Sequence, residues 1–421
     1  MTRVVVIGGG ATGLFVALDL SLRGVEVVVV ERGDIGSGTS GKFHGMLHSG
    51  ARYAVNDPQA ARECVQESEV MSKIAPHAVE DTGGLFVALN EEEANFGDKL
   101  SSALKSVGAE HREVEREEAL KQEPALSHAL RRAIWVHDRV VHGYDLLSSV
   151  ALTAFENGAK VLTFTEVVDF LKGGGVKVRD VPSGRTYEIR SDHVVNAAGP
   201  WTFRLAELEG ETGVEVMPTA GTMAVFSGRP VNSVLNRMRP PSDGDILLPY
   251  GGNVIAGTTA KVVDDPNQVE ADDEEVELLR RESSAMVPWL EGRKPVRTYA
   301  SVRPLVKQPG ASGRSATRDF VIHEHHSGLV TSVIGGKLTT SRLVGEKTAD
   351  RVGETLGVRE RSRTAFTELL SPRSEKGVRL IEKGLGFVHV NSREGGVDQE
   401  RYEVVACWAT SIALRRMSLE G

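Results

Sequence analysis

Cysteine is scarce in this sequence, with only Cys64 and Cys407 among 421 residues. Two isolated cysteines exclude a disulfide framework, and they exclude an iron–sulfur cluster with four cysteine ligands housed in this chain alone. A reducing compartment is the simplest setting for such a protein.

Long apolar runs are also missing. Residues 4–30 are rich in valine, isoleucine, leucine and glycine, but Asp19, Arg23 and Glu26 interrupt them. No segment offers the roughly 20 uninterrupted apolar residues that a membrane-spanning helix needs, and no basic start with a small-residue cleavage site marks a secretory signal. We expect the chain to be cytoplasmic, or at most attached peripherally at the inner face of the cell membrane.

Positive charge is not in excess, because 50 lysines and arginines stand against 58 aspartates and glutamates, for a net charge of −8. This balance disfavours a nucleic-acid-binding protein. The sequence is 40% apolar and 26% charged, which is typical of a globular protein. Its length indicates two or three domains, or two interleaved ones.

The N-terminus carries the pattern of a dinucleotide-binding unit. A β-branched run, Val4–Ile7, leads into a glycine-rich turn and then into a helix over residues 14–23. A second strand, residues 25–30, ends at Glu31, whose carboxylate suits ribose hydroxyls. The glycines allow a tight turn, close approach of a pyrophosphate and close helix packing, and the helix N-terminus faces the phosphates. The predicted cofactor contacts here are Gly8, Gly10, Ala11, Thr12, Gly13, Glu31 and Arg32.

Two later segments favour FAD. Residues 193–199 form a strand that ends in small residues, and residues 335–340 form a glycine turn that opens a helix. A helix N-terminus can stabilise the negative charge of a reduced flavin. The predicted contacts in these segments are Ala198, Gly199, Trp201, Gly336, Lys337, Leu338 and Thr339.

The rest of the pattern alternates helices and strands. Eight acidic residues between Asp264 and Glu277 are interpreted as a solvated loop and a helix N-terminus. Helices are predicted over residues 58–74, 90–120, 338–356 and 402–417, and strands over 85–89, 161–181, 214–226, 246–257 and 328–334.

The segment Thr39–Tyr53 closely resembles the flavin-contacting segment of FAD-dependent glycerol-3-phosphate dehydrogenases, and it looks most like the large subunit of the anaerobic enzyme. The family belongs to the D-amino-acid-oxidase-like flavoproteins, and the resemblance covers roughly residues 1–345. Further segments match the same family in order: Ser242–Pro249, Gly257–Thr259, Ser301–Leu305, Thr317–Phe320 and Gly336–Thr340.

The resemblance implies an α/β fold, in which a discontinuous Rossmann-type FAD-binding domain holds an inserted α+β substrate domain. The expected boundaries are 1–85, 145–212 and 300–357 for the FAD-binding domain and 86–144 and 213–299 for the substrate-binding domain. Residues 358–421 would form a short C-terminal helical remnant, in place of the cysteine-rich tail of the anaerobic large subunits.

The resemblance also implies oxidation of sn-glycerol 3-phosphate to dihydroxyacetone phosphate, with a hydride passing from C2 to flavin N5. Electrons would continue to quinone, directly or through an electron-transfer or membrane-anchor subunit. The segment Thr39–Tyr53 adds the flavin contacts Thr39, Ser40, His44 and Gly45.

A phosphorylated polyol needs cations around its phosphate, and arginine supplies a planar charged fork where lysine supplies a point charge. Each such residue taken alone is more often a surface charge or an ion-pair partner. With the family match, the predicted substrate contacts are Arg52, Arg303, Arg318 and Lys337, with Tyr53 either beside the substrate or simply buried.

The C2 hydroxyl must also lose a proton, and histidine is the usual base near neutral pH. His48 is the first candidate, with a structural hydrogen bond as the alternative. His44 and His323 are weaker candidates, and Arg318 could instead lower the pKa of the hydroxyl electrostatically.

Two other functions remain open from the sequence. A related flavoenzyme acting on a 2-hydroxy acid or an amino acid would need one carboxylate clamp rather than four cations. A non-catalytic flavin-binding subunit would be expected to lack the phosphate and proton-handling residues that this sequence carries.

Overall fold

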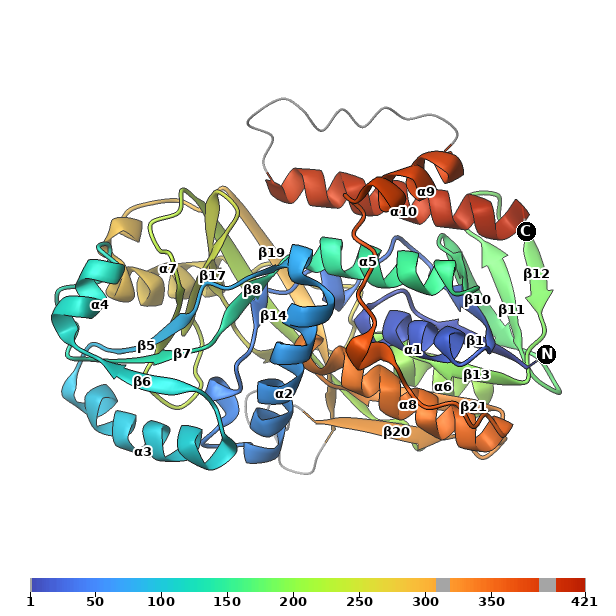
Figure 1. Cartoon of the computed structure of the whole chain (residues 1–421), viewed down its shortest axis with the longest axis horizontal. Coiled ribbons are helices and arrows are strands. Elements are labelled where there is room, and N and C mark those ends of the chain that lie inside the picture. Colours follow the sequence, from blue (N-terminus) through green and yellow to red (C-terminus); the bar gives the residue numbers. More distant parts are fainter. Residues whose placement is uncertain (1, 308–318, 386–398, 421) are drawn as a thin grey trace.

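The computed structural model describes residues 2–307, 319–385 and 399–420. Two parts, each built on its own large sheet, lie side by side in Figure 1, with the N-terminal strand and the C-terminal helices in the right-hand part. Segments from both ends and from the middle of the chain meet in that right-hand part.

The sheet on the right is mostly parallel and is built around β1. In the described residues its order is β20-β21-β13-β1-β2-β9, with β20 alone antiparallel to its neighbour. Its inner strands β1, β2, β13 and β21 are buried on both faces, as their β-branched runs predict. The strands are β1 (Arg3–Ile7), β2 (Glu26–Val30), β9 (Lys160–Leu162), β13 (His193–Asn196), β20 (Phe320–Glu324) and β21 (Val330–Gly335).

Helices cover one face of this sheet and a small sheet covers part of the other. Gly345 lets α8 lie directly on α1, because a Cβ there would come within 2.7 Å of the Phe15 Cβ. On the other face, valines of the small sheet pack against those of β1 and β2. The helices on the first face are α1 (Ala11–Leu22), α5 (Gly143–Glu156) and α8 (Ser341–Leu356). The other face carries α6 (Thr202–Glu209) and the small sheet of β10 (Thr165–Phe170), β11 (Val176–Asp180) and β12 (Thr186–Ile189).

The sheet on the left is mixed. Its order along the described chain is β18-β14-β17-β16-β15-β5-β7-β6, and β19 also pairs with β14. The strands are β5 (Gly84–Ala88), β6 (His111–Val114), β7 (Arg132–Val136), β14 (Val216–Ser227), β15 (Val234–Arg237), β16 (Ile246–Tyr250), β17 (Asn253–Gly257), β18 (Lys261–Val262) and β19 (Arg297–Val306), and the helices are α3 (Glu91–Val107), α4 (Arg116–Gln122) and α7 (Asp273–Met286).

Short elements link the two parts. The strands β3 (Met46–Leu47) and β4 (Val79–Glu80) pair with β8 (Arg139–Val141) beside helix α2 (Pro58–Ile74). Single 3-10 turns are η1 (Thr39–Gly41), η2 (Ala51–Tyr53), η3 (Pro76–Ala78), η4 (Gly199–Trp201), η5 (Pro288–Leu290), η6 (Leu338–Thr340) and η7 (Thr364–Phe366).

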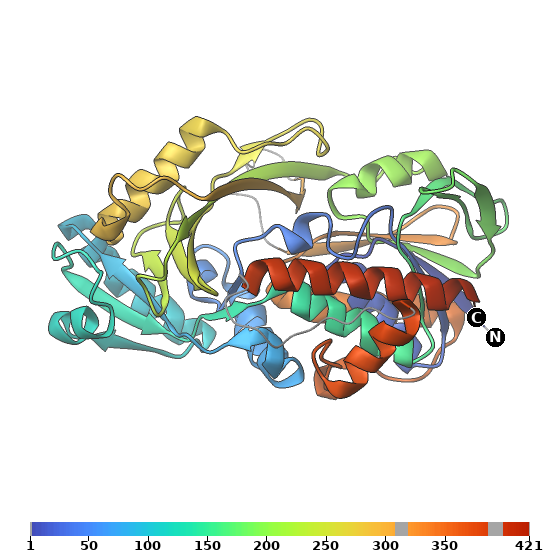
Figure 2. The same cartoon turned by 90° about the horizontal axis from the view of Figure 1, so that it is seen from above.

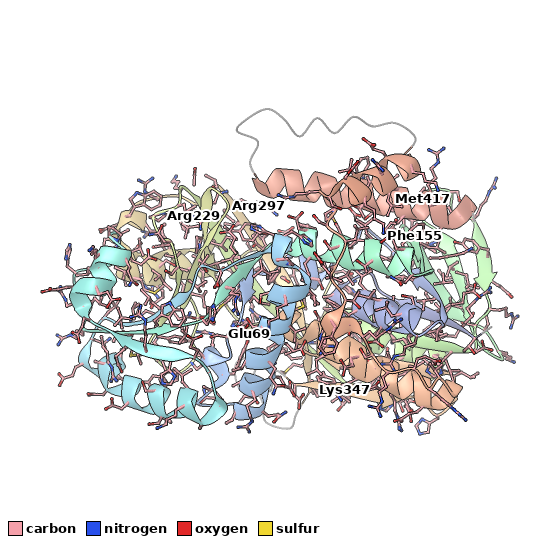
Figure 3. The ribbon with its side chains drawn as sticks, in the orientation of Figure 1. Glu69, Phe155, Arg229, Arg297, Lys347 and Met417 are labelled. Atoms are coloured by element: carbon pink, nitrogen blue, oxygen red, sulfur yellow. The ribbon has the colours of Figure 1, made fainter. Side chains whose placement is uncertain are left out.

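The C-terminal segment packs on the parallel sheet's helices and edge. Helices α9 (Glu375–Leu385) and α10 (Gln399–Glu420) lie above α5 in Figure 1, and Figure 2 shows α10 running along it. Met417 on α10 and Phe155 on α5, both labelled in Figure 3, border the same buried cluster. The Ser418 hydroxyl accepts the N–H of Val161 at 2.9 Å, so α10 provides a hydrogen-bond acceptor for a backbone donor of the edge strand β9.

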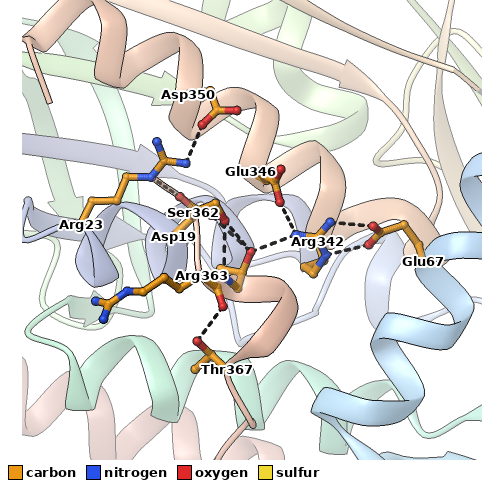
Figure 4. A network of polar contacts seen from close by, with 10 residues as sticks. Asp19, Arg23, Glu67, Arg342, Glu346, Asp350, Ser362, Arg363 and Thr367 are labelled. Carbon is orange, nitrogen blue, oxygen red and sulfur yellow. Dashed lines mark hydrogen bonds and ion pairs between the residues drawn. The ribbon is translucent and has the colours of Figure 1, made fainter. Parts of the chain in front are cut away.

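A buried polar network fixes the connection between α8 and α9 (Figure 4). The Arg342 guanidinium binds the Glu67 carboxylate through two hydrogen bonds of 2.8 and 2.6 Å, and a third goes to Thr364. Thr364 in turn donates to Asp19 at 3.2 Å, and Ser362 also donates to Asp19. Burial raises the pKa of the Asp19 carboxyl. The network therefore ties α1, α2 and α8 to the segment that leads into the C-terminal helices.

Most predicted elements are confirmed, including helix α2 over 58–74 and the βαβ unit. The single helix predicted over 90–120 is wrong, because His111–Val114 forms strand β6 on the edge of the mixed sheet and only α3 and α4 flank it. The helix expected over 402–417 is observed as α10, whereas the sequence pattern does not predict α9. Within the described residues, no helix combines the length and the hydrophobicity that crossing a bilayer requires.

Candidate active site

A cavity of about 570 Å³ opens at the carboxyl ends of the parallel strands. Parallel α/β sheets bind their ligands at this edge. The glycine turn, segments 37–48 and 197–205 and the turn before α8 line it from the parallel-sheet side, while Arg303 on β19 lines it from the mixed sheet. The cavity therefore lies where the two sheets meet.

The turn between β1 and α1 is made of glycines, and their lack of side chains lets β1, β13 and α1 approach closely. Gly8 has a φ of +111°, and a Cβ there would lie 2.5 Å from the carbonyl oxygen of Ala197. A Cβ at Gly13 would collide with the carbonyl oxygen of Gly8, so this residue serves packing and does not line the cavity. These are the roles that the sequence pattern predicts for the first and third glycines.

Glu31 lines the cavity at the end of β2. Its carboxylate oxygens accept the backbone N–H groups of Gly9 and Gly33, each at 2.7 Å. Burial raises the pKa of the Glu31 carboxyl although these hydrogen bonds oppose the rise. A carboxylate oxygen has two lone pairs, so the oxygen that binds Gly9 can accept a second donor, as a ribose hydroxyl requires.

The residues present fit FAD. The cavity lining includes Glu31, whose carboxylate can bind a ribose. It also includes the glycine turn at the N-terminus of α1, which can bind a pyrophosphate. Arg303 and Lys337 add positive charge to the lining. Other predicted contacts that line it are Gly8, Gly10, Ala11, Thr12, Arg32, Thr39, Ser40, His44, Ala198, Gly199, Trp201, Gly336, Leu338 and Thr339.

The predicted contact Gly45 does not line the cavity. It has a φ of +95°, and a Cβ there would come within 2.8 Å of the Tyr250 ring. Gly45 thus lets the segment after η1 pass close to the mixed sheet.

A row of side chains lines the end of the cavity near α8. The ring centroid of His48 lies 5.7 Å from that of His44 and 5.2 Å from that of Tyr53. The Lys337 ammonium lies 5.3 Å from the centre of the Tyr53 ring. The Thr339 hydroxyl accepts the backbone N–H of His48 at 3.1 Å, which joins this row to the turn before α8. The structure thus brings together residues predicted from separate motifs.

The protonation of His44 is determined by its neighbours. Its Nδ1 lies 3.0 Å from the N–H of Met46 and accepts that hydrogen bond, so the ring proton is on Nε2. Burial, with Arg303 and Arg52 adding to it, lowers the pKa of His44 to about 3. A ring whose acceptor nitrogen is already used is poorly suited to take a proton from a substrate.

Arg303 extends from β19 into the cavity, and residues of the mixed sheet hold its guanidinium. Its guanidinium donates to the Thr258 hydroxyl at 2.7 Å and to the Thr259 carbonyl at 3.2 Å. Gly221 on the neighbouring strand β14 makes room for it, because a Cβ there would lie 2.5 Å from Arg303 Nη2. Sequence reasoning missed Gly221, although a glycine inside a strand signals a close approach.

Two other predicted residues lie away from the cavity, and a third is not among the described residues. Arg52 does not line the cavity, and its guanidinium binds the buried Asp245 carboxylate at 3.1 Å. His323 lies on β20 with its Nε2 3.4 Å from Glu211, and the cavity lining does not include it. Arg318 lies outside the described residues.

Comparison with known proteins places the chain in a family. Residues 3–351 match the family model of the FAD-dependent oxidoreductases. The chain belongs to this family. FAD as the cofactor and the predicted α/β flavoprotein fold are thereby confirmed.

Two curated relatives extend the comparison, and both are subunits of anaerobic glycerol-3-phosphate dehydrogenases. The relative from Haloferax volcanii is 39% identical over 383 residues, which cover 86% of this chain and 65% of that protein. The relative from Escherichia coli is 39% identical over 368 residues, covering 84% of this chain and 67% of that protein. The chain thus spans about two thirds of the length of these relatives, and the resemblance stated from its motifs is confirmed.

A solved structure agrees with this fold. The glycerol-3-phosphate dehydrogenase of Bacillus halodurans, solved with FAD, has a TM-score of 0.70 to this chain at 23% identity, over 98% of this chain and 76% of that one. At this identity the likeness concerns the fold alone.

Proposed function

We propose that the protein oxidises sn-glycerol 3-phosphate to dihydroxyacetone phosphate, with FAD as the cofactor. The observation that carries the proposal is the joint lining of one cavity by Arg303, Lys337, His48 and Tyr53. Two cations beside a histidine suit a substrate that has a phosphate at one end and an oxidisable hydroxyl near it. The names of the curated relatives support the same substrate.

Arg303 and Lys337 bind the phosphate in this proposal. Arg303 is oriented by Thr258 and Thr259, so it loses little freedom when a phosphate oxygen arrives. Lys337 stands at the start of η6, where a cation opposes the helix dipole unless an anion is bound beside it. Arg318 remains a proposed contact, and Arg52 acts at longer range through its positive charge.

His48 takes the proton of the C2 hydroxyl. It is 7% exposed, which excludes most bulk water from its ring, and Thr339 fixes its backbone. Tyr53 packs edge-on against it and limits its rotation. When bound, the flavin supplies N5 as the acceptor of the hydride. The substrate thus loses a hydride from C2 and a proton from its hydroxyl, which together make the two-electron oxidation of the alcohol to a ketone.

The acceptor of the electrons is also part of the proposal. We infer that electrons pass to quinone, directly or through a second protein, and that the protein works peripherally at the membrane. The designation of the relatives as subunits supports such a partner.

The two large sheets support the proposed division of the chain. Strands from 3–30, 160–162, 193–196 and 320–335 share the parallel sheet, and strands from 84–136 and 216–306 share the mixed one. This membership supports, in outline, an FAD-binding domain of residues 1–85, 145–212 and 300–357 with a substrate-binding domain of 86–144 and 213–299. Strands β5 and β19 cross the proposed boundaries at 85 and 300 and belong to the mixed sheet over their whole length. Residues 358–421 then form a separate helical segment.

Anaerobic titration of the yellow holoprotein with sn-glycerol 3-phosphate tests the proposal. Bleaching of the flavin absorbance near about 450 nm is expected. Parallel titrations with lactate and glycine serve as controls for the hydroxy-acid and amino-acid alternatives. Bleaching by either of these at lower concentration than by glycerol 3-phosphate would overturn the substrate assignment and leave the FAD assignment intact.

A further inference from the structure

The acid-rich segment between β18 and α7 contacts the cofactor cavity. Residues 263–272 form a loop that starts and ends in the mixed-sheet part, and Figure 2 shows it extending toward α6. Asn267 from this loop lines the cavity, as do Arg32, Trp201 and Arg204 from the opposite part. The interpretation of this stretch as merely a solvated loop is therefore incomplete.

The contacts across the cavity mouth converge on Asn267. Its Oδ1 accepts the indole N–H of Trp201 at 2.8 Å and a guanidinium N–H of Arg32 at 3.2 Å. The Arg32 guanidinium also stacks on the Trp201 ring, with 4.1 Å between its Cζ and the ring centre. One amide oxygen thus holds together two side chains that follow β2 and β13.

Asp265 shapes the loop so that Asn267 faces the cavity. Its Oδ1 accepts the backbone N–H of Asn267 at 2.9 Å and the side-chain amide of Asn267 at 3.0 Å. The same oxygen binds the Arg204 guanidinium of α6 at 2.9 Å. The negative loop and the positive residues Arg32 and Arg204 are complementary in charge.

We propose that residues 263–272 are a clasp that retains FAD, with Asn267 as its contact residue and Asp265 as its positioning residue. The clasp crosses the end of the cavity where Glu31 stands, so it covers the ribose-binding side. Because it joins the mixed-sheet part to the parallel-sheet part, FAD leaves only when these contacts break. This inference rests on FAD binding alone and is independent of the substrate.

Release of FAD from the full-length holoprotein tests the clasp. Diluted holoprotein is followed by the rise in fluorescence of free FAD, and folding of each variant is checked by thermal unfolding. We expect Asn267→Ala and Asp265→Asn to release FAD about tenfold faster than the wild type. Salt should accelerate release from the wild type and have less effect on Asp265→Asn, because the Asp265–Arg204 pair is partly exposed and screened.

Glu270→Gln is the matched control, since it removes a carboxylate from the same loop. Within the described part of the chain, Glu270 is not a partner of Arg32, Trp201 or Arg204. The Glu270→Gln variant should release FAD at the rate of the wild type. If Asn267→Ala releases FAD within twofold of the wild-type rate, or if Glu270→Gln releases it as fast as Asn267→Ala, the clasp is disproved.

A double variant guards against simple misfolding. Arg204→Gln removes the ion-pair partner of Asp265, whereas Asp265→Asn also weakens the contacts with Asn267. The Asp265→Asn/Arg204→Gln double variant should therefore release FAD no faster than Asp265→Asn alone. Fully additive effects of the two substitutions would show that the pair does not act as one contact and would overturn the positioning role of Asp265.

Discussion

Arg303 donates a 2.7 Å hydrogen bond to the hydroxyl of Thr258 and thereby presents a fixed guanidinium to the cavity. Arg303 lies on β19 and Thr258 directly follows β17, and Gly221 on β14 leaves the space for this contact. A cation held in this way binds an anion at low entropic cost, which makes its geometry as important as its charge.

Substitutions at Arg303 and Gly221 separate charge from geometry. Arg303→Lys keeps the charge and loses the fork, and we expect the KM for glycerol 3-phosphate to rise roughly 10- to 100-fold. Gly221→Ala keeps Arg303 but places a Cβ 2.5 Å from its Nη2, so a similar rise is expected. Steady-state kinetics measures both. Gly252→Ala is the control, because a Cβ there meets open space. An unchanged KM in both Arg303→Lys and Gly221→Ala would show that Arg303 does not bind the phosphate.

The assignment of His48 rather than His44 as the base predicts unequal effects. His48→Gln should lower the rate of anaerobic flavin reduction by about 10²- to 10⁴-fold, the range for loss of a general base. His44→Gln should lower it far less, since its Nδ1 already accepts a hydrogen bond from Met46. Stopped-flow absorbance gives both rates. Equal losses, or a larger loss in His44→Gln, would contradict the assignment.

The burial of His44 predicts a pH dependence of stability. Its pKa is about 3 in the folded state against an ordinary value of 6.5, so the folded state binds fewer protons between these values. The free energy of unfolding must therefore fall as the pH drops below 6.5, by about 1.4 kcal/mol per pH unit for this group. Urea unfolding of wild type and His44→Gln at pH 7 and pH 5 measures the difference, expected to be about 2 kcal/mol. His193, whose pKa is about 4, contributes in the same direction to both proteins. Parallel curves for the two proteins would mean that His44 is protonated in the folded state.

Most cofactor contacts proposed from the sequence line the cavity because the signals that mark them are local. Gly8, Gly13 and Glu31 belong to one continuous βαβ unit, where strand, turn and helix follow each other within about 30 residues. The spacing of these residues alone determines where they meet. Lys337 is predictable for the same reason, since it stands in a glycine turn at the start of a helix.

The substrate half is less predictable because its geometry depends on pairing between distant strands. The contact of Arg303 with Thr258 follows from the pairing of both β19 and β17 with β14. Arg52 and Asn267 illustrate both kinds of error. Arg52 lies in a matching motif yet its guanidinium binds Asp245, whereas Asn267 lies in an acidic loop without a motif and reaches the cavity. Neither outcome is encoded in local spacing.

The strand β6 escapes prediction for a similar reason. Three of its four residues, His111–Val114, are polar, so the segment lacks the alternation of apolar and polar residues that indicates a strand. Pairing with β7 in the mixed sheet supplies the hydrogen bonds that make them a strand. A long charged stretch favours a helix when only local propensity is considered, and here the sheet edge overrides it.

The network around Arg342 predicts where the fold is most sensitive to loss of a charge. Arg342 is 3% exposed and Glu67 is 4% exposed, and the two form a bidentate pair between α8 and α2. Arg342→Met leaves the Glu67 carboxylate buried without its counter-ion, and we expect the free energy of unfolding to fall by about 3–5 kcal/mol. Arg351→Met on the same helix is the control. Its side chain is 51% exposed and pairs with Glu324, so a loss of at most about 1 kcal/mol is expected.

Urea unfolding of both variants measures this difference, and the double variant Glu67→Leu/Arg342→Met tests its cause. If the large loss in Arg342→Met arises from the unpaired carboxylate, replacing both partners with apolar residues should recover much of the stability. If it arises instead from the lost contacts of Arg342 with Thr364 and Glu346, the double variant should remain as unstable as Arg342→Met. The hydrogen bonds of Ser362 and Thr364 to Asp19 do not involve Arg342, so we expect them to persist in both variants.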